Sequence, residues 1–260
     1  MIPGGELKPG AAHLWCASPD DLLAQERALH CAALLAEDER AHWQSFRFER
    51  RRREYLATRA LVRSALSRHR PLLPADWRFA RNVYGKPRTV PACGLGFNLS
   101  NSPRLVVCLV ARNAAVGVDT EPFERAAQIA ELAPEVFSPL ELAEFKLLDG
   151  RARLERALSL WTLKESYIKA RGMGLALPLD RFSFLFGGGA SARLEIDPSL
   201  GDDPRRWQFG LLDHAGHRIA YMIEGRKAPE LKLHEIRLPG AKAPVRTPRR
   251  ACAAPQLQRA

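Results

Sequence analysis

The chain has 260 residues, of which 46% are hydrophobic, and it carries a formal charge of +11 at pH 7. That length permits one large domain or two small ones, and the apolar content is typical of a globular protein with a real core. Part of the charge is local, since residues 239–260 hold five basic residues and no acid, but the rest of the chain still carries +6. A basic surface favours an anionic partner: nucleic acid, a phosphorylated small molecule, an acidic protein or a membrane surface.

The cysteines are odd in number, widely spaced and without a Cys-x-x-Cys pair: Cys16, Cys31, Cys93, Cys108 and Cys252. This usage favours reduced thiols and excludes a disulfide or zinc framework. The N-terminus lacks the basic start and apolar run of a signal peptide, and no stretch is long and apolar enough to span a membrane. We therefore expect a cytoplasmic protein.

In chain order, a Gly/Pro-rich lead-in over residues 1–12 precedes a strand at 13–17. Ser18 and Pro19 are the N-cap and first-turn residues of a helix. Helical periodicity continues this helix over 22–30 and returns in two further segments, 34–46 and 46–69. The arginines in the first turns of the last segment are either a solvated face or a phosphate-binding cluster, because guanidinium matches phosphate oxygens.

Strands and turns occupy the middle of the chain. Strands are expected over 77–81, 105–111 and 114–122. The Tyr-Gly-Lys-Pro turn between the first two presents Lys86 at a defined place, as plain turn chemistry or as a phosphate contact. The polar run 98–102 is interpreted as a cap and turn, although that leaves Ser100 and Asn101 incompletely explained.

Two carboxylates mark the strand at 114–122. Asp119 and Glu121 are two residues apart, so they share one strand face about 7 Å apart. On a surface strand they would be two solvated acids, but Mg²⁺ prefers such oxygen ligands.

The segment 153–175 is an amphipathic helix stopped by Gly172. Glu165 lies near the middle of its apolar stripe, flanked by Lys164 and Lys169. A carboxylate there is costly unless a cation meets it, so it is a buried ion pair, a metal ligand or a general base. Strands at 175–186 and 231–236 and a hairpin of 207–212 with 218–223 follow, and the Ala/Pro/Arg composition of 239–260 predicts a basic disordered tail.

Three motifs stand in order along the chain: GKP (85–87) with FNLSNS (97–102), GVDTE (117–121) and WTLKESYIKARGMGL (161–175). Together they resemble the 4′-phosphopantetheinyl transferase superfamily, in its larger branch with two pseudo-equivalent halves in one chain. The resemblance implies an α+β fold of two similar α/β halves related by a pseudo-two-fold axis, with the active site in the cleft between them. The domains would be an N-terminal half over 13–115 with coenzyme A contacts and a C-terminal half over 116–238 with the metal and catalytic residues.

The resemblance also implies a reaction: Mg²⁺-dependent transfer of 4′-phosphopantetheine from coenzyme A to a serine of an acyl- or peptidyl-carrier protein, releasing 3′,5′-ADP. Asp119, Glu121 and Glu165 would be the metal ligands, and Glu165 and Lys169 the catalytic residues. The coenzyme contacts would be Arg50, Arg53, Lys86, Asn98, Ser100, Asn101 and Lys164. Asn101 departs from the histidine of many members, so it cannot supply a charged phosphate contact. Trp161 would pack in the core.

The resemblance implies an acidic carrier protein as the partner, with neither nucleic acid nor a membrane involved, and a monomer. A different Mg²⁺-dependent phosphate-transfer enzyme, acting on nucleic acid or nucleotides, remains the alternative. A non-catalytic nucleic-acid-binding protein is disfavoured because the basic residues lack aromatic interleaving. The pathway served by the carrier is left open.

Overall fold

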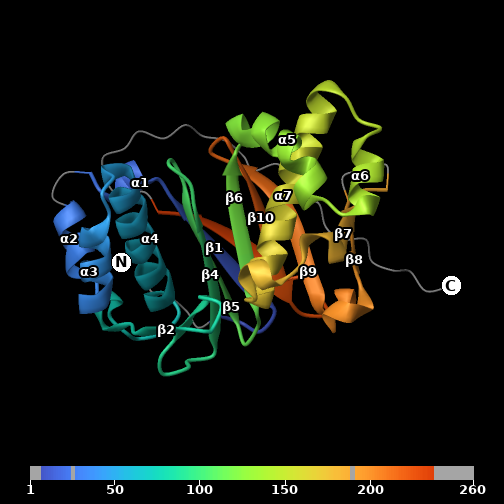
Figure 1. Cartoon of the computed structure of the whole chain (residues 1–260). Helices are drawn as coiled ribbons and strands as arrows, with labels where there is room; N and C mark the ends of the chain where they lie inside the picture. Colours follow the sequence, from blue (N-terminus) through green and yellow to red (C-terminus); the bar gives the residue numbers. More distant parts are fainter. Residues whose placement is uncertain (1–6, 25–26, 188–190, 237–260) are drawn as a thin grey trace. The chain divides into compact units, whose positions relative to one another are not determined.

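The computed structural model describes residues 7–24, 27–187 and 191–236. The basic tail expected at 239–260 lies outside these ranges, as does the start of the lead-in. The described chain divides into two compact units (Figure 1). The first unit holds residues 7–116 and 230–236, and the second holds Gly117–Pro229. Each unit combines helices with strands, which confirms the α+β class.

The first unit is built on a four-stranded sheet in the order β11-β1-β5-β4. Its strands are β1 (Ala11–Ala17), β4 (Leu95–Asn101), β5 (Val106–Arg112) and β11 (Glu230–Glu235). Strand β5 is antiparallel to both β1 and β4, whereas β11 runs parallel to β1. A small antiparallel hairpin of β2 (Phe79–Arg81) and β3 (Pro87–Thr89) lies in the same unit.

Helices cover this sheet. They are α1 (Pro19–Leu22), α2 (Arg27–Ala33), α3 (Glu37–Ser45) and α4 (Glu49–Ser67), with a 3₁₀ turn at Pro74–Asp76. Figure 1 shows α4 lying along the sheet, and its contacts with β5 are extensive. Leu61 and Leu66 of α4 and Val110 of β5 are fully buried in one core cluster. The expected N-cap is confirmed, because the Ser18 side chain accepts hydrogen bonds from the amides of Asp20 and Asp21.

Two expectations for the first unit were wrong. The lead-in is shorter than 1–12, because Leu7 is buried and β1 begins at Ala11. The polar run 98–102 is mostly strand instead of cap and turn, because β4 extends to Asn101 and pairs with β5. Phe97 packs in the core while Asn98 and Ser100 share the opposite face of β4, by the two-residue period of a strand.

The second unit contains a three-stranded sheet in the order β6-β10-β9 and a two-stranded sheet of β7 with β8. The strands are β6 (Val116–Pro122), β7 (Phe182–Leu185), β8 (Arg193–Ile196), β9 (Trp207–His214) and β10 (His217–Glu224). The helices are α5 (Ala126–Val136), α6 (Pro139–Phe145) and α7 (Gly150–Arg171). Short 3₁₀ turns lie at Phe123–Arg125, Gly174–Ala176, Leu179–Arg181, Pro198–Leu200 and Pro204–Arg206.

Helix α7 is the central element of the second unit, packed against β10 and α5. It ends as the sequence predicts, at Gly172 in the left-handed conformation with φ of 66°. The backbone of β6 lies directly against the backbone of α7 at Gly117. A Cβ atom at this position would lie 1.9 Å from the carbonyl oxygen of Ser166. Only glycine permits that approach, and it brings the strand residues after Gly117 beside the last turns of α7.

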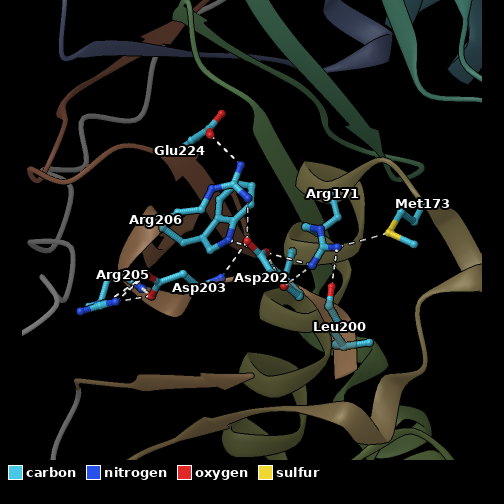
Figure 2. Close-up of polar contacts among 10 residues, drawn as sticks. Arg171, Met173, Leu200, Asp202, Asp203, Arg205, Arg206 and Glu224 are labelled. Atoms are coloured by element: carbon cyan, nitrogen blue, oxygen red, sulfur yellow. Dashed lines mark hydrogen bonds and ion pairs between the residues drawn. The ribbon is translucent and has the colours of Figure 1, made fainter. Parts of the chain in front are cut away.

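The end of α7 is also held from its other side. The fully buried carboxylate of Asp202 accepts hydrogen bonds from the Tyr167 hydroxyl at 2.7 Å, from Arg171 at 2.9 Å and from the Trp207 indole at 2.8 Å. Figure 2 shows Arg171 and Arg206 converging on this carboxylate. At about 100° per residue, Tyr167 and Arg171 face away from Glu165 and Lys169. Asp202 therefore binds the face of α7 opposite to these two residues.

Two strand assignments needed correction. The strand expected over 231–236 was placed in the C-terminal half, yet it pairs with β1 and belongs to the first unit. The strand expected over 175–186 begins only at Phe182, because 3₁₀ turns occupy the residues before it. Among the described helices, none is long and apolar enough to cross a membrane.

Candidate active site

The two acids of β6 are buried. Asp119 is 4% exposed and Glu121 is 8% exposed, so the interpretation as two solvated surface acids is wrong. Their common strand face follows from the two-residue period. Burying two carboxylates this close requires positive partners, and the structure provides one for each.

Lys169 is the partner of Asp119. Its Nζ donates to Asp119 Oδ1 at 2.7 Å, and the Lys169 side chain is 27% exposed. Lys169 lies one helical turn after Glu165 on α7, so both project from the same face of the helix. The predicted catalytic pair and the predicted metal ligand Asp119 therefore come together in the second unit.

Glu121 has two partners, both on one oxygen. Arg125 donates to Glu121 Oε1 at 2.6 Å, and the indole N–H of Trp161 donates to the same oxygen at 3.0 Å. Trp161 was expected to act only by packing in the core. It is instead half-buried and forms a direct hydrogen bond with a predicted metal ligand.

The carboxylates act on one another electrostatically. Burial raises the pKa of Glu165, the charge of Asp119 raises it further, and Lys169 opposes both effects. Burial likewise raises the pKa of Glu121, with Asp119 adding to the shift and Arg125 opposing it. This mutual repulsion among oxygen donors is what a divalent cation relieves, so the donor set fits Mg²⁺.

The carboxylates are nevertheless not arranged as a finished metal site. Within 7–24, 27–187 and 191–236, no three His, Cys, Asp or Glu side chains are placed to hold a metal ion together. Lys169 and Arg125 occupy oxygens of Asp119 and Glu121 instead.

The expectation that Lys164 contacts the coenzyme was wrong. Its side chain is 1% exposed, and its Nζ donates to Glu141 Oε2 at 2.6 Å and to the carbonyl oxygen of Phe182 at 2.8 Å. Glu141 also accepts the amides of Ser138 and Phe184, both at 2.8 Å. Lys164 therefore joins α7 to α6 and β7, and its burial keeps it from reaching a phosphate.

The first unit contains a pocket of about 340 Å³. It is lined by His42, Phe46, Arg51, Glu54, Tyr55, Thr58, Arg59, Arg81, Pro87, Asn98, Leu99 and Asn101. A neighbouring pocket of about 310 Å³ shares five of these residues and adds Arg63 and Arg78. The predicted coenzyme residues Asn98 and Asn101 thus lie in a basic hollow beside the GKP turn.

The other predicted coenzyme residues lie elsewhere. Arg50 pairs with Glu54 at 3.1 Å and Arg53 pairs with Asp20 at 2.9 Å, and neither lines the pocket. Their neighbour Arg51 lines it and pairs with Glu54 at 3.4 Å. Lys86 Nζ donates to the carbonyl oxygen of Val116 at 3.0 Å. Ser100 is 6% exposed on the same face of β4 as Asn98.

Among the lining residues that the sequence did not indicate are His42, Tyr55, Arg59 and Arg81. The pair Tyr55 and Arg59 has an (i, i+4) spacing, and the Arg59 guanidinium lies over the Tyr55 ring at 5.1 Å. Arg81 pairs in register with Pro87 of GKP.

The sequence is similar to known proteins over most of its length. Residues 115–222 match the 4′-phosphopantetheinyl transferase superfamily. The chain is 30% identical to 4′-phosphopantetheinyl transferase HetI from Nostoc over 76% of this chain and 83% of that protein. It is 31% identical to 4′-phosphopantetheinyl transferase Sfp from Bacillus subtilis over 69% of this chain and 79% of that protein.

Among solved structures, holo-[acyl-carrier-protein] synthase from Neisseria meningitidis aligns with 43% of this chain and 97% of that chain. The TM-score of that alignment is 0.37 and the identity is 18%. The two sequence relatives establish the family, because this chain aligns with 83% of one transferase and 79% of the other. The chain belongs to the 4′-phosphopantetheinyl transferase superfamily.

Proposed function

We propose that this protein transfers the 4′-phosphopantetheine group of coenzyme A to a serine hydroxyl of an acyl- or peptidyl-carrier protein, releasing 3′,5′-ADP. The observation that carries the proposal is the group formed by the buried acids Asp119 and Glu121 with the half-buried Glu165 and Lys169, in which Lys169 donates to Asp119 at 2.7 Å. Phosphoryl transfer to an alcohol needs a base, cations beside the phosphates and a fixed geometry, and this group supplies those parts.

Glu165 is the base in this proposal. Burial raises the pKa of its carboxyl, with Asp119 adding to the effect, so the carboxylate takes up a proton more readily than an exposed glutamate. It accepts the proton of the carrier serine as the hydroxyl oxygen attacks the phosphorus. Lys169 is the cation that stabilises charge on the leaving 3′,5′-ADP, and it returns a proton there.

Asp119, Glu121 and Glu165 would hold the divalent ion. All three supply carboxylate oxygens, the ligands that Mg²⁺ prefers. When bound, the ion would neutralise the negative charge of the pyrophosphate.

The pocket of the first unit is proposed to bind the phosphorylated adenosine end of coenzyme A. Arg51, Arg59 and Arg81 supply its positive charge, and Asn98 and Asn101 supply neutral hydrogen-bonding groups. The chain's net charge of +11 favours an acidic carrier domain as the second substrate. A coenzyme site shared by the two halves, a monomeric state and a cytoplasmic location stay predictions. The relatives favour this transferase over a phosphate-transfer enzyme acting on nucleic acid or nucleotides.

The direct test is to incubate the protein with Mg²⁺, coenzyme A and an apo carrier protein and to weigh the carrier. A gain of one phosphopantetheine group per carrier is expected, and none should appear with Glu165→Gln. Glu131→Gln is the matched control, because it changes an exposed glutamate of the same unit. Absence of any gain on acyl- and peptidyl-carrier proteins alike would refute the proposal.

The coenzyme pocket has its own test. Arg81→Gln should raise KM for coenzyme A about tenfold with kcat little changed, because a charge-assisted hydrogen bond to phosphate is lost. Arg53→Gln removes an arginine outside the pocket and should leave KM unchanged. A raised KM for Arg53→Gln beside a normal one for Arg81→Gln would place the phosphate at the start of α4 instead.

A further inference from the structure

Glu121 is held differently from the other two acids. Among the described residues, Arg125 and Trp161 donate hydrogen bonds to its side chain, and both bonds go to Oε1 and not to Oε2. The side chain of Glu121 is 11% exposed, and that of Arg125 is 37% exposed. An indole N–H and a guanidinium can only donate, so both contacts require Glu121 as an acceptor in one orientation.

The two donors come from different elements. Arg125 lies in the 3₁₀ turn Phe123–Arg125, four residues after Glu121, and Trp161 projects from the middle of α7. Trp161 also lies one helical turn before Glu165. The hydrogen bond from Trp161 to Glu121 therefore links the strand that carries two of the acids to the helix that carries the third.

We propose that Trp161 and Arg125 are positioning residues for Glu121, which keep Oε1 occupied and so leave Oε2 to the divalent cation. The proposal rests on the metal role of Glu121 in the proposed function. The two residues act differently on the cation. Trp161 is neutral and only fixes the orientation of the Glu121 carboxylate. Arg125 also carries a positive charge, which repels the divalent cation at Glu121. Trp161 thus favours metal binding, and the charge of Arg125 limits it.

The test measures metal binding by the full-length protein without turnover. Mn²⁺ is titrated in the presence of coenzyme A and the absence of a carrier protein, and bound Mn²⁺ is followed by electron paramagnetic resonance against a protein-free blank. Trp161→Phe should weaken Mn²⁺ binding about tenfold, the effect of losing one hydrogen bond to a charged group. Arg125→Gln keeps a donor but removes the charge, so it should bind Mn²⁺ several-fold more tightly.

Trp207→Phe is the matched control. It removes an indole N–H bond of the same kind, 2.8 Å from the carboxylate of Asp202, which has no part in the proposed metal site. Its Mn²⁺ affinity should equal that of the wild type even if its thermal stability falls. An equal loss of affinity in Trp161→Phe and Trp207→Phe would reduce the role of Trp161 to general packing and would overturn the proposal.

The outcomes separate this proposal from the proposed function. If Glu121→Ala binds Mn²⁺ as well as the wild type does, the metal assignment itself fails. If Glu121→Ala loses affinity and a folded Trp161→Phe does not, only the positioning role fails. Should Trp161→Phe not fold, Arg125→Gln decides, because unchanged or weaker binding contradicts the charge effect.

Discussion

Lys164→Met is the substitution that best separates a structural from a catalytic role in α7. Lys164 and Glu141 are at most 1% exposed and 2.6 Å apart. Removing one partner of a buried ion pair costs about 3–5 kcal/mol, because the other charge is left unpaired. That is a large share of a typical unfolding free energy of about 5–15 kcal/mol. We expect the melting temperature to fall by on the order of 10 °C.

The assay has two readouts: thermal unfolding followed by circular dichroism, and carrier modification per folded molecule. Lys164→Met should lose stability but keep transfer at temperatures where it is folded. Adding Glu141→Gln removes the stranded charge and keeps an acceptor for one of the Ser138 and Phe184 amides, which bind different oxygens of Glu141, so the double variant should recover part of the loss. A variant that melts like the wild type but no longer modifies the carrier would refute the structural role and restore Lys164 as a phosphate contact.

Three further predictions follow from the site and the first unit. Glu165→Gln should abolish transfer while leaving the melting temperature within a few degrees of the wild type, and a half-active variant would assign the base elsewhere. Asn101→His should be tolerated and should bind coenzyme A at least as tightly near pH 6, measured by calorimetry, because the ring can then carry charge; a variant that no longer binds would mean that the pocket is built around asparagine. Burial, together with His234, His69 and Lys232, lowers the pKa of His13 to about 4 from 6.5, so the unfolded chain binds more protons between those values and stability should fall as pH drops from 6.5 to 4. His13→Gln should flatten that pH profile in denaturant titrations, and an unchanged profile would show that His13 is not the group responsible.

The parts of the site that the sequence predicts are those with strong local signals. Asp119 and Glu121 follow from the two-residue period of a strand, and the end of α7 follows from Gly172. The approach of β6 to α7 at Gly117 then places the acids beside Glu165 and Lys169, which spacing alone could not establish.

The parts that escaped prediction depend on contacts between distant residues. The burial of Lys164 escaped prediction because its partner Glu141 lies 23 residues upstream in the capping box of α6. The polar composition of 98–102 concealed the strand period that becomes evident once β4 pairs with β5. The partner of β11 is more than 200 residues away in the sequence, and parallel pairing leaves no local mark.

The pairing of β11 with β1 has a consequence for the order in which the chain folds during synthesis. Every residue of the second unit, Gly117–Pro229, leaves the ribosome before Glu230 does, so that unit can complete its core first. Until β11 emerges, β1 is an open edge strand with unpaired backbone groups, the kind of edge that recruits strands from other molecules. A chain truncated after Pro229 would retain that open edge permanently and should associate with copies of itself.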